Sequence, residues 1–338
     1  MDHYSAIPTL ALENAQPHFD GDYIYAGTSA YALTSKLLSE AEREKIIGAP
    51  TVADLIEVLR GTFFGTYFAG DTRDVDQALS KAMVEAKKNL DRLSSNPHLL
   101  SILWLRYDFY NLKILMKHNS PEYDSTSEDS FIPLGLHSFA IMERAVKSSN
   151  AAALHNTLSS SITGAPKNLE ALDAYLDARY LEAALYEAEQ SDEPFAVQYV
   201  RLRMNLFVIL SGLRAHTRGE SPIHIASSDF SERDIANPEL LLARLSHMGF
   251  SRHWATAIER YRSTNDFSEL DRAADEFVMK WLKRQSISLN SPAPLFAYWH
   301  VFRENVQLIR AAHTARKVGM NEKTLREIIR TSYNTYAY

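Results

Sequence analysis

The residues that most resemble a metal site lie in the stretch DTRDVD (71–76), where Asp71, Asp74 and Asp76 crowd together. Carboxylates grouped in this way are ligands for Mg²⁺, as a helical prenyl-transfer enzyme would require. The same aspartates stand just before the predicted helix ALSKAMVEAKK, and negative charge there stabilises the positive end of a helix. No second acidic motif that could complete such a Mg²⁺ site occurs elsewhere in the chain. We therefore favour a helix-capping role over Mg²⁺ binding.

Other patterns that carry chemistry are missing. The segment GTFFGTYFAG lacks both the spacing of a phosphate-binding loop and the Lys-Ser or Lys-Thr that should follow it. Neither HExxH nor Gly-x-Ser-x-Gly occurs, and the absence of cysteine excludes thiolate catalysis, disulfides and Cys-based zinc sites. His137 and His155 lie in apolar segments and are interpreted as structural. We expect no catalytic residue, no metal site and no cofactor, and no ATP hydrolysis by this chain itself.

Composition narrows the class of protein further. The 338 residues are 46% hydrophobic and 23% charged, as in an ordinary folded protein, and the net charge of -6 argues against nucleic-acid binding. The opening MDHYSAIPTLALENAQ lacks the basic region and the long apolar core of a signal peptide. Because no apolar run approaches the roughly 18 residues that span a bilayer, any association with a membrane should be peripheral.

The sequence predicts helices throughout the chain. Glycine and proline are scarce, at twelve each, and leucine and alanine recur at helical spacing in segments such as VDQALSKAMVEAKKNLDRL. One kind of helix, apolar on nearly every side with an asparagine at its centre, appears three times about a hundred residues apart. The copies are LRYDFYNLKILMK, VRLRMNLFVIL and VFRENVQLIRAA, centred on Asn111, Asn205 and Asn305.

Each copy is preceded by matching features. A polar residue and a proline, which suit the start of a helix, come before the three helices as Asn96-Pro97, Glu193-Pro194 and Ser291-Pro292. In each copy, an earlier predicted helix has a leucine at a similar distance before the asparagine. These leucines are Leu79, Leu172 and Leu270, which precede the asparagines by 32, 33 and 35 residues. The polar stretches 118–130 and 217–234 separate the copies. The pattern predicts three helical modules at 1–120, 121–230 and 231–338.

An asparagine in a helix that is apolar all round needs hydrogen-bond partners, or its burial costs about 1–3 kcal/mol. We expect Asn111, Asn205 and Asn305 to bond to a carbonyl or polar side chain of a neighbouring helix at the same place in each copy. A direct ligand role is the alternative. If equivalent surfaces join the modules, they either spiral or close around a pseudo-threefold axis as a cup or funnel.

Several of these segments resemble one protein family. The segments DYIYAGTSAYALTSKLLSEAEREKII and TVADLIEVLRGTFFGTY are similar to the opening of the C subunit of V-type/A-type rotary ATPases, which is called the d subunit in eukaryotes. LRYDFYNLKILMK resembles that family's Arg-Tyr-Asp-x-x-Asn-Leu-Lys helix. LDARYLEAALYEA, VRLRMNLFVILSGLRA and PLFAYWHVFRENVQLIRAAHTARKVGMNEKTLREIIR match later parts, so the resemblance covers about residues 20–332.

The resemblance implies a funnel of three helical domains without an active site. It further implies a place in the central stalk, at the cytoplasmic face of a membrane that the chain does not enter. The partners would be the subunits of the rotating central shaft and the proteolipid c-ring that moves protons or sodium ions. The chain departs from the family pattern at Ser29 and Tyr31, where two arginines are usual, and at Val306 and Gln307, where Leu and Arg are usual.

Three further interpretations stay open. The last part of the chain carries a basic run that is either a solvated helix face or a contact for an acidic partner, formed by Arg316, Lys317, Lys323, Arg326 and Arg330. A helical-repeat adaptor of an unrelated complex would keep the three modules without the family. A magnesium-dependent helical enzyme is the remaining alternative.

Overall fold

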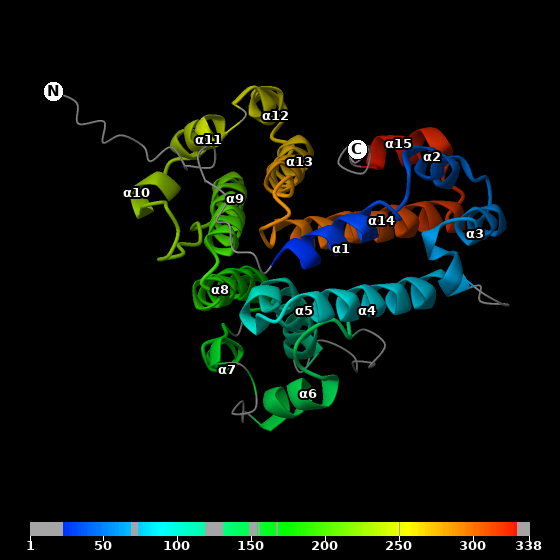
Figure 1. Cartoon of the computed structure of the whole chain (residues 1–338). Coiled ribbons are helices and arrows are strands. Elements are labelled where there is room, and N and C mark those ends of the chain that lie inside the picture. The colour runs from blue at the N-terminus through cyan, green and yellow to red at the C-terminus, as the bar shows by residue number, and fades with distance from the viewer. Residues whose placement is uncertain are drawn as a thin grey trace. The chain divides into compact units, whose positions relative to one another are not determined.

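The computed structural model describes residues 23–68, 74–118, 131–148, 154, 156–166, 168–249 and 251–329. All regular elements within these ranges are helices, and none of these residues forms a strand (Figure 1). The prediction of an all-α fold is confirmed. The helices group into two compact units, one holding residues 96–270 and the other residues 23–95 together with 271–329. The three module boundaries and their pseudo-threefold arrangement stay predictions.

In the first unit, α5 (Pro97–His118) packs along α8 (Leu169–Gln190), with α6 (Phe139–Ser148) and α7 (Asn156–Thr163) against them (Figure 1). These helices share an apolar core that includes Leu105, Phe109, Leu112, Leu172 and Leu176. Lys113 forms an ion pair with Asp177 at 2.7 Å, and Lys117 forms one with Asp173 at 2.6 Å. The apolar seam between α5 and α8 is therefore bordered by ion pairs that set the register of the two helices.

The rest of the first unit is built on α9 (Pro194–Arg218), which packs on α8 and on α11 (Pro238–His247). The short helix α10 (Glu232–Ile235) precedes α11, and α12 (Ser251–Thr264) follows it. Leu112 of α5 and Leu206 of α9 are both buried, so truncating either to alanine should cost about 2–5 kcal/mol of stability. The helix α13 (Ser268–Gln285) begins in the first unit and continues into the second.

In the second unit, helices from the two ends of the chain share one core. The long helix α14 (Ala293–Lys317) packs against α1 (Ile24–Thr34), α2 (Glu40–Gly48), α3 (Val52–Arg60) and α4 (Val75–Leu93). Figure 1 shows α1 lying alongside α14. Phe64, on the 3₁₀ helix η3 (Phe63–Phe68), lies with its ring 5.5 Å from that of Phe302, which also stacks on Trp299. The last helix, α15 (Glu322–Ile328), contacts α2 and α14.

Local sequence signals explain where many of these helices begin. Pro97 and Pro194 are the first residues of α5 and α9, as predicted, and Pro292 immediately precedes α14. The Asn96 side chain accepts hydrogen bonds from the amides of His98 and Leu99. Ser39 and Ser231 each form a reciprocal capping box, with Glu42 at the start of α2 and with Asp234 at the start of α10. These caps satisfy amides that have no partner within the helix.

Candidate functional site

The aspartate cluster caps a helix in the structure. The Asp74 side chain accepts a hydrogen bond from the Gln77 amide at 3.0 Å at the start of α4. Asp76 lies in the first turn, with its carboxylate 3.4 Å from Nε of Arg310 on α14. Asp71 lies outside the described residues. The contacts of Asp74 and Asp76 match the capping interpretation. Among the described residues, no group of three or more His, Asp or Glu side chains is arranged to hold a metal ion.

The most concentrated polar site in the described residues joins α5 to the segment that follows it. Asp108 is fully buried and accepts hydrogen bonds from the backbone amides of Leu136 at 2.9 Å and His137 at 3.2 Å. Its Oδ2 also lies 3.0 Å from Nδ1 of the His137 ring. A Cβ atom at Gly135 would overlap the Asp108 carboxylate, so only glycine fits there without a shift. This connector, residues 131–137, is held by a carboxylate inside the helix.

Asn111, one turn after Asp108, holds the same connector at a second point. Its Nδ2 donates to the carbonyl of Ile132 and its Oδ1 accepts from the Ile132 amide, both at 2.9 Å. A side-chain amide paired with one residue in this way replaces both hydrogen bonds that the residue would make in a strand. The partner of Asn111 is therefore a connecting segment 21 residues further along, and not a neighbouring helix as we expected.

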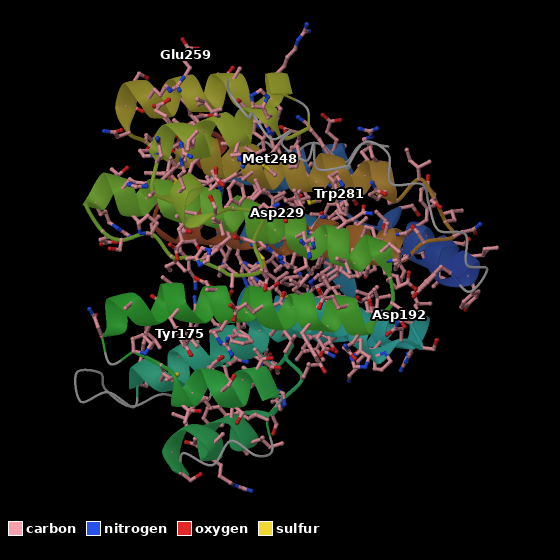
Figure 2. The ribbon with its side chains drawn as sticks, turned by 90° about the vertical axis from the view of Figure 1, so that its left-hand side faces the viewer. Tyr175, Asp192, Asp229, Met248, Glu259 and Trp281 are labelled. Carbon is pink, nitrogen blue, oxygen red and sulfur yellow. The ribbon has the colours of Figure 1, made fainter. Side chains whose placement is uncertain are left out.

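Asn205 makes a closely similar contact in the middle of the chain. Its Nδ2 donates to the Asp229 side chain at 2.8 Å, and its Oδ1 accepts from the Asp229 amide at 3.4 Å. Arg201, one turn earlier on α9, forms an ion pair with Asp229 at 3.1 Å. Asp229 lies beside α9 in Figure 2, just before the capping residue of α10. Again a buried asparagine of a long helix fixes the segment that leads to the next short helix.

Asn305 behaves differently. Its Nδ2 donates back to the Val301 carbonyl of its own helix, and its buried Oδ1 has no hydrogen-bond partner among the described residues. The adjacent Glu304 carboxyl is also poorly satisfied, and burial raises the pKa of Glu304 to about 8 although Arg303 and Arg43 oppose the shift. The three asparagines are all buried, but only Asn111 and Asn205 hold a connector. Their interpretation as equivalent repeat positions stays a prediction.

Several of the remaining sequence candidates take structural positions, and Arg330 of the basic run lies outside the described residues. His137 contacts Asp108 as described above, whereas His155 lies outside the described residues. In the basic run, Arg316 donates hydrogen bonds to the carbonyls of Met320 and Ile47. Arg326 pairs with Glu44 and Glu322 at 2.8 and 2.7 Å, and these two partners raise its pKa. Both arginines therefore help to fix α15 and the end of α14 onto α2.

Sequence reasoning missed two of the residues that matter here. Asp108 stands three positions before Asn111 in an apolar helix, which puts both side chains on one face. The argument that identified the asparagine applies with more force to a carboxylate, because burying an unpartnered charge costs more than burying an amide. Gly135 carried no comparable signal, because its role depends on a carboxylate 27 residues away (135 - 108).

The fold and this site define a class of protein. The chain is a helical framework whose internal polar groups hold its own connectors, and the described residues bring together no catalytic constellation. Among the described residues, no helix combines the length and the apolar character needed to cross a bilayer.

Comparison with known proteins places the chain within that class. Residues 28–328 match the family described as ATP synthase (C/AC39) subunit, and the chain belongs to this family. The C subunit of the V-type sodium ATPase of Enterococcus hirae is 20% identical over 322 residues, which cover 88% of this chain and 95% of that protein. The chain is accordingly a non-catalytic subunit of a rotary ATPase. The resemblance inferred from LRYDFYNLKILMK and the other segments is confirmed.

Proposed function

We propose that this subunit is the socket of the central stalk, which couples the rotating shaft to the proteolipid c-ring during ion transport. The observation that carries the proposal is the family match over residues 28–328. The nearly full-length similarity to the C subunit of a V-type sodium ATPase supports it as well. In this role the chain lies at the cytoplasmic face of the membrane and contacts the shaft subunits on one side and the ring on the other.

The order of the helices supports three modules that close on one another. A short helix preceded by serine occurs three times, as α2, α6 and α10, and each is followed by further helices and then by a long asparagine helix, α5, α9 or α14. Each long helix contacts the short helix that begins the next set: α5 contacts α6, α9 contacts α10, and α14 contacts α2. Helix α14 of the third set and helix α2 of the first set thus pack together within the second unit, which is a contact that the proposed closed arrangement requires.

A socket that transmits torque has to resist internal sliding. Close-packed helices provide low compressibility, and the contacts in this chain add polar attachments at the weakest points, which are the connectors. Asp108 and Asn111 hold residues 131–137, and Asn205 with Arg201 holds Asp229. We infer that torque passes through the shape of this stiff body and many modest contacts, without one dominant residue.

The first test is composition of the native complex. A tagged copy of the chain, purified in mild detergent from membranes of the organism that makes it, should bring the shaft and ring subunits with it. A tagged unrelated helical protein provides the control for non-specific capture. Recovery of the chain without any other component of the rotary ATPase would contradict the proposal.

The second test concerns coupling. Complexes that lack this chain should still hydrolyse ATP in their catalytic part but should lose ATP-driven ion uptake into vesicles. Adding the purified chain back should restore uptake without raising the rate of hydrolysis at each catalytic site. Ion uptake at an unchanged ratio to hydrolysis in the depleted complex would show that another subunit makes the connection.

A further inference from the structure

The outer face of α1 is unusual for a protein surface because it carries no charge. Ile24, Tyr25 and Tyr31 are exposed there, Tyr25 by 76%, and the other exposed positions of the helix are Thr28 and Ala32. The opposite side of α1 is buried within the second unit, so the helix is fixed with this face outward. Large apolar side chains gathered on one exposed face usually mark a surface that binds something.

The connection between α13 and α14 extends this face. Ile287 is 81% exposed, and Leu289 is partly exposed beside it. The Leu289 backbone approaches α1 so closely that a Cβ atom at Gly27 would overlap its carbonyl. Between the two segments lies a mainly apolar hollow of about 370 Å³, lined by residues that include Tyr31, Thr34 and Ile287. We call the exposed Ile24, Tyr25, Tyr31, Ile287 and Leu289 the α1 patch.

The charges around the α1 patch are all of one sign in the two segments that form it. Residues 23–39 and 277–303 contain no aspartate or glutamate. Lys283 lines the hollow, while Lys36 follows α1 and Arg284 follows Lys283. A partner that covers the patch should therefore combine an apolar region, which contacts the patch, with negative charges, which contact the surrounding lysine and arginine side chains.

We propose that the α1 patch binds the surface of an anionic lipid bilayer. Tyrosine prefers the level of the lipid headgroups, where its ring is in an apolar layer and its hydroxyl is hydrated. Ile24 and Ile287 reach the outermost acyl region, and the lysines contact lipid phosphates while their stems lie along the patch. Because each lysine or arginine near an anionic surface strengthens binding about fivefold, two or three cations beside a small apolar patch give reversible, peripheral attachment.

This inference goes beyond the coupling role and does not depend on it, because it concerns lipid and not the ring or the shaft. An acidic protein surface could satisfy the same charges. We favour lipid because the patch and the two segments that form it combine the groups that suit a bilayer interface: exposed aliphatic side chains, tyrosine rings, uncharged Ser and Thr, and lysine or arginine in segments that contain no aspartate or glutamate.

The test is co-sedimentation of the full chain with two kinds of vesicles, one of phosphatidylcholine alone and one containing phosphatidylglycerol as well. The chain should bind the anionic vesicles more tightly, and added salt should weaken that binding. Ile287→Asp should reduce it at least about tenfold, because it removes apolar burial and adds a negative charge. Lys283→Gln should reduce it about fivefold. Circular dichroism checks that each variant is folded.

Two matched variants provide the controls. Leu240→Asp introduces the same charge at an exposed leucine of α11, and Lys88→Gln removes an exposed lysine of α4. Both should leave vesicle binding unchanged within about a factor of two. Equal binding to neutral and anionic vesicles, or equal losses in Ile287→Asp and Leu240→Asp, would overturn the proposal. If the chain does not bind vesicles, but the Ile287→Asp variant no longer co-purifies with the rotary ATPase, a protein covers the patch and the lipid proposal is wrong.

Discussion

Removing the Asp108 carboxylate should destabilise the first unit more than any single surface change. Asp108→Ala leaves three donors without their acceptor: the amides of Leu136 and His137 and the His137 ring nitrogen. Hydrogen bonds to a charged group are worth about 1.5–3 kcal/mol each. Two effects reduce this cost. Leu136 is partly exposed, so water can replace some of the lost hydrogen bonds, and the folded state no longer has to desolvate the Asp108 carboxylate. We therefore expect a loss of about 3–5 kcal/mol, close to the contribution of two such hydrogen bonds.

The measurement is urea unfolding followed by circular dichroism, combined with hydrogen exchange of the Leu136 and His137 amides. Asp173→Ala is the matched control, because that carboxylate forms a partly exposed ion pair with Lys117 and should contribute about 1 kcal/mol or less. In Asp108→Ala the two amides should exchange much faster, whereas in Asp173→Ala they should not. If the two variants differ by less than about 1 kcal/mol, or if exchange at these amides is unchanged, the carboxylate does not hold the connector.

Three further comparisons, each made by denaturant unfolding, test other contacts of the two units. Asn305→Leu should change stability by no more than about 1 kcal/mol, because it removes a buried oxygen that has no hydrogen-bond partner among the described residues. Asn111→Leu should lose about 1–3 kcal/mol, and equal losses in the two variants would contradict this. Gly135→Ala should lose at least about 2 kcal/mol because its Cβ overlaps a buried carboxylate, and Gly249→Ala, with open space around it, should be neutral. Glu304→Gln tests the pKa of Glu304, which burial raises from 4.5 to about 8. Between these pH values the folded state keeps a proton that the unfolded state has lost. The native chain should therefore lose stability relative to the variant by about 1.4 kcal/mol for each pH unit of increase in that interval. A difference that does not vary between these pH values would show that the Glu304 carboxyl is hydrated.

The helices could be predicted from the sequence because their signals are local. Leucine and alanine at helical spacing, with proline at the first position of α5 and α9, determine where these elements lie. The burial of Asn111 followed from the same pattern. Its partner did not, because Ile132 lies beyond a polar stretch that has no periodicity. Hydrogen bonds between a helix and a later connector depend on how the chain folds back, and no residue pattern near Asn111 records this.

The packing partners of the long helices could not be predicted from the sequence either. The repeat suggests that helices within a module pack together, but α5 packs most extensively on α8, which belongs to the next predicted module. Likewise α14 packs on α1–α4, from the other end of the chain. A repeated pattern reveals which segments are alike but not which copy each one contacts.

Asn305, whose Oδ1 has no hydrogen-bond partner among the described residues, fits this view of the connectors. Residues 119–138 and 219–231 link α5 and α9 to the next short helix, and an asparagine in each long helix holds a residue in the later part of that link. After α14 the chain turns at once into α15, and no connector among the described residues forms a hydrogen bond with Asn305 Oδ1. There Arg316 holds the turn through the Met320 carbonyl and reaches across to the Ile47 carbonyl of α2. The third junction therefore uses an arginine at the helix end where the first two use an asparagine at the helix centre, and it ties the last helices of the chain to the first ones without a peptide connection between them.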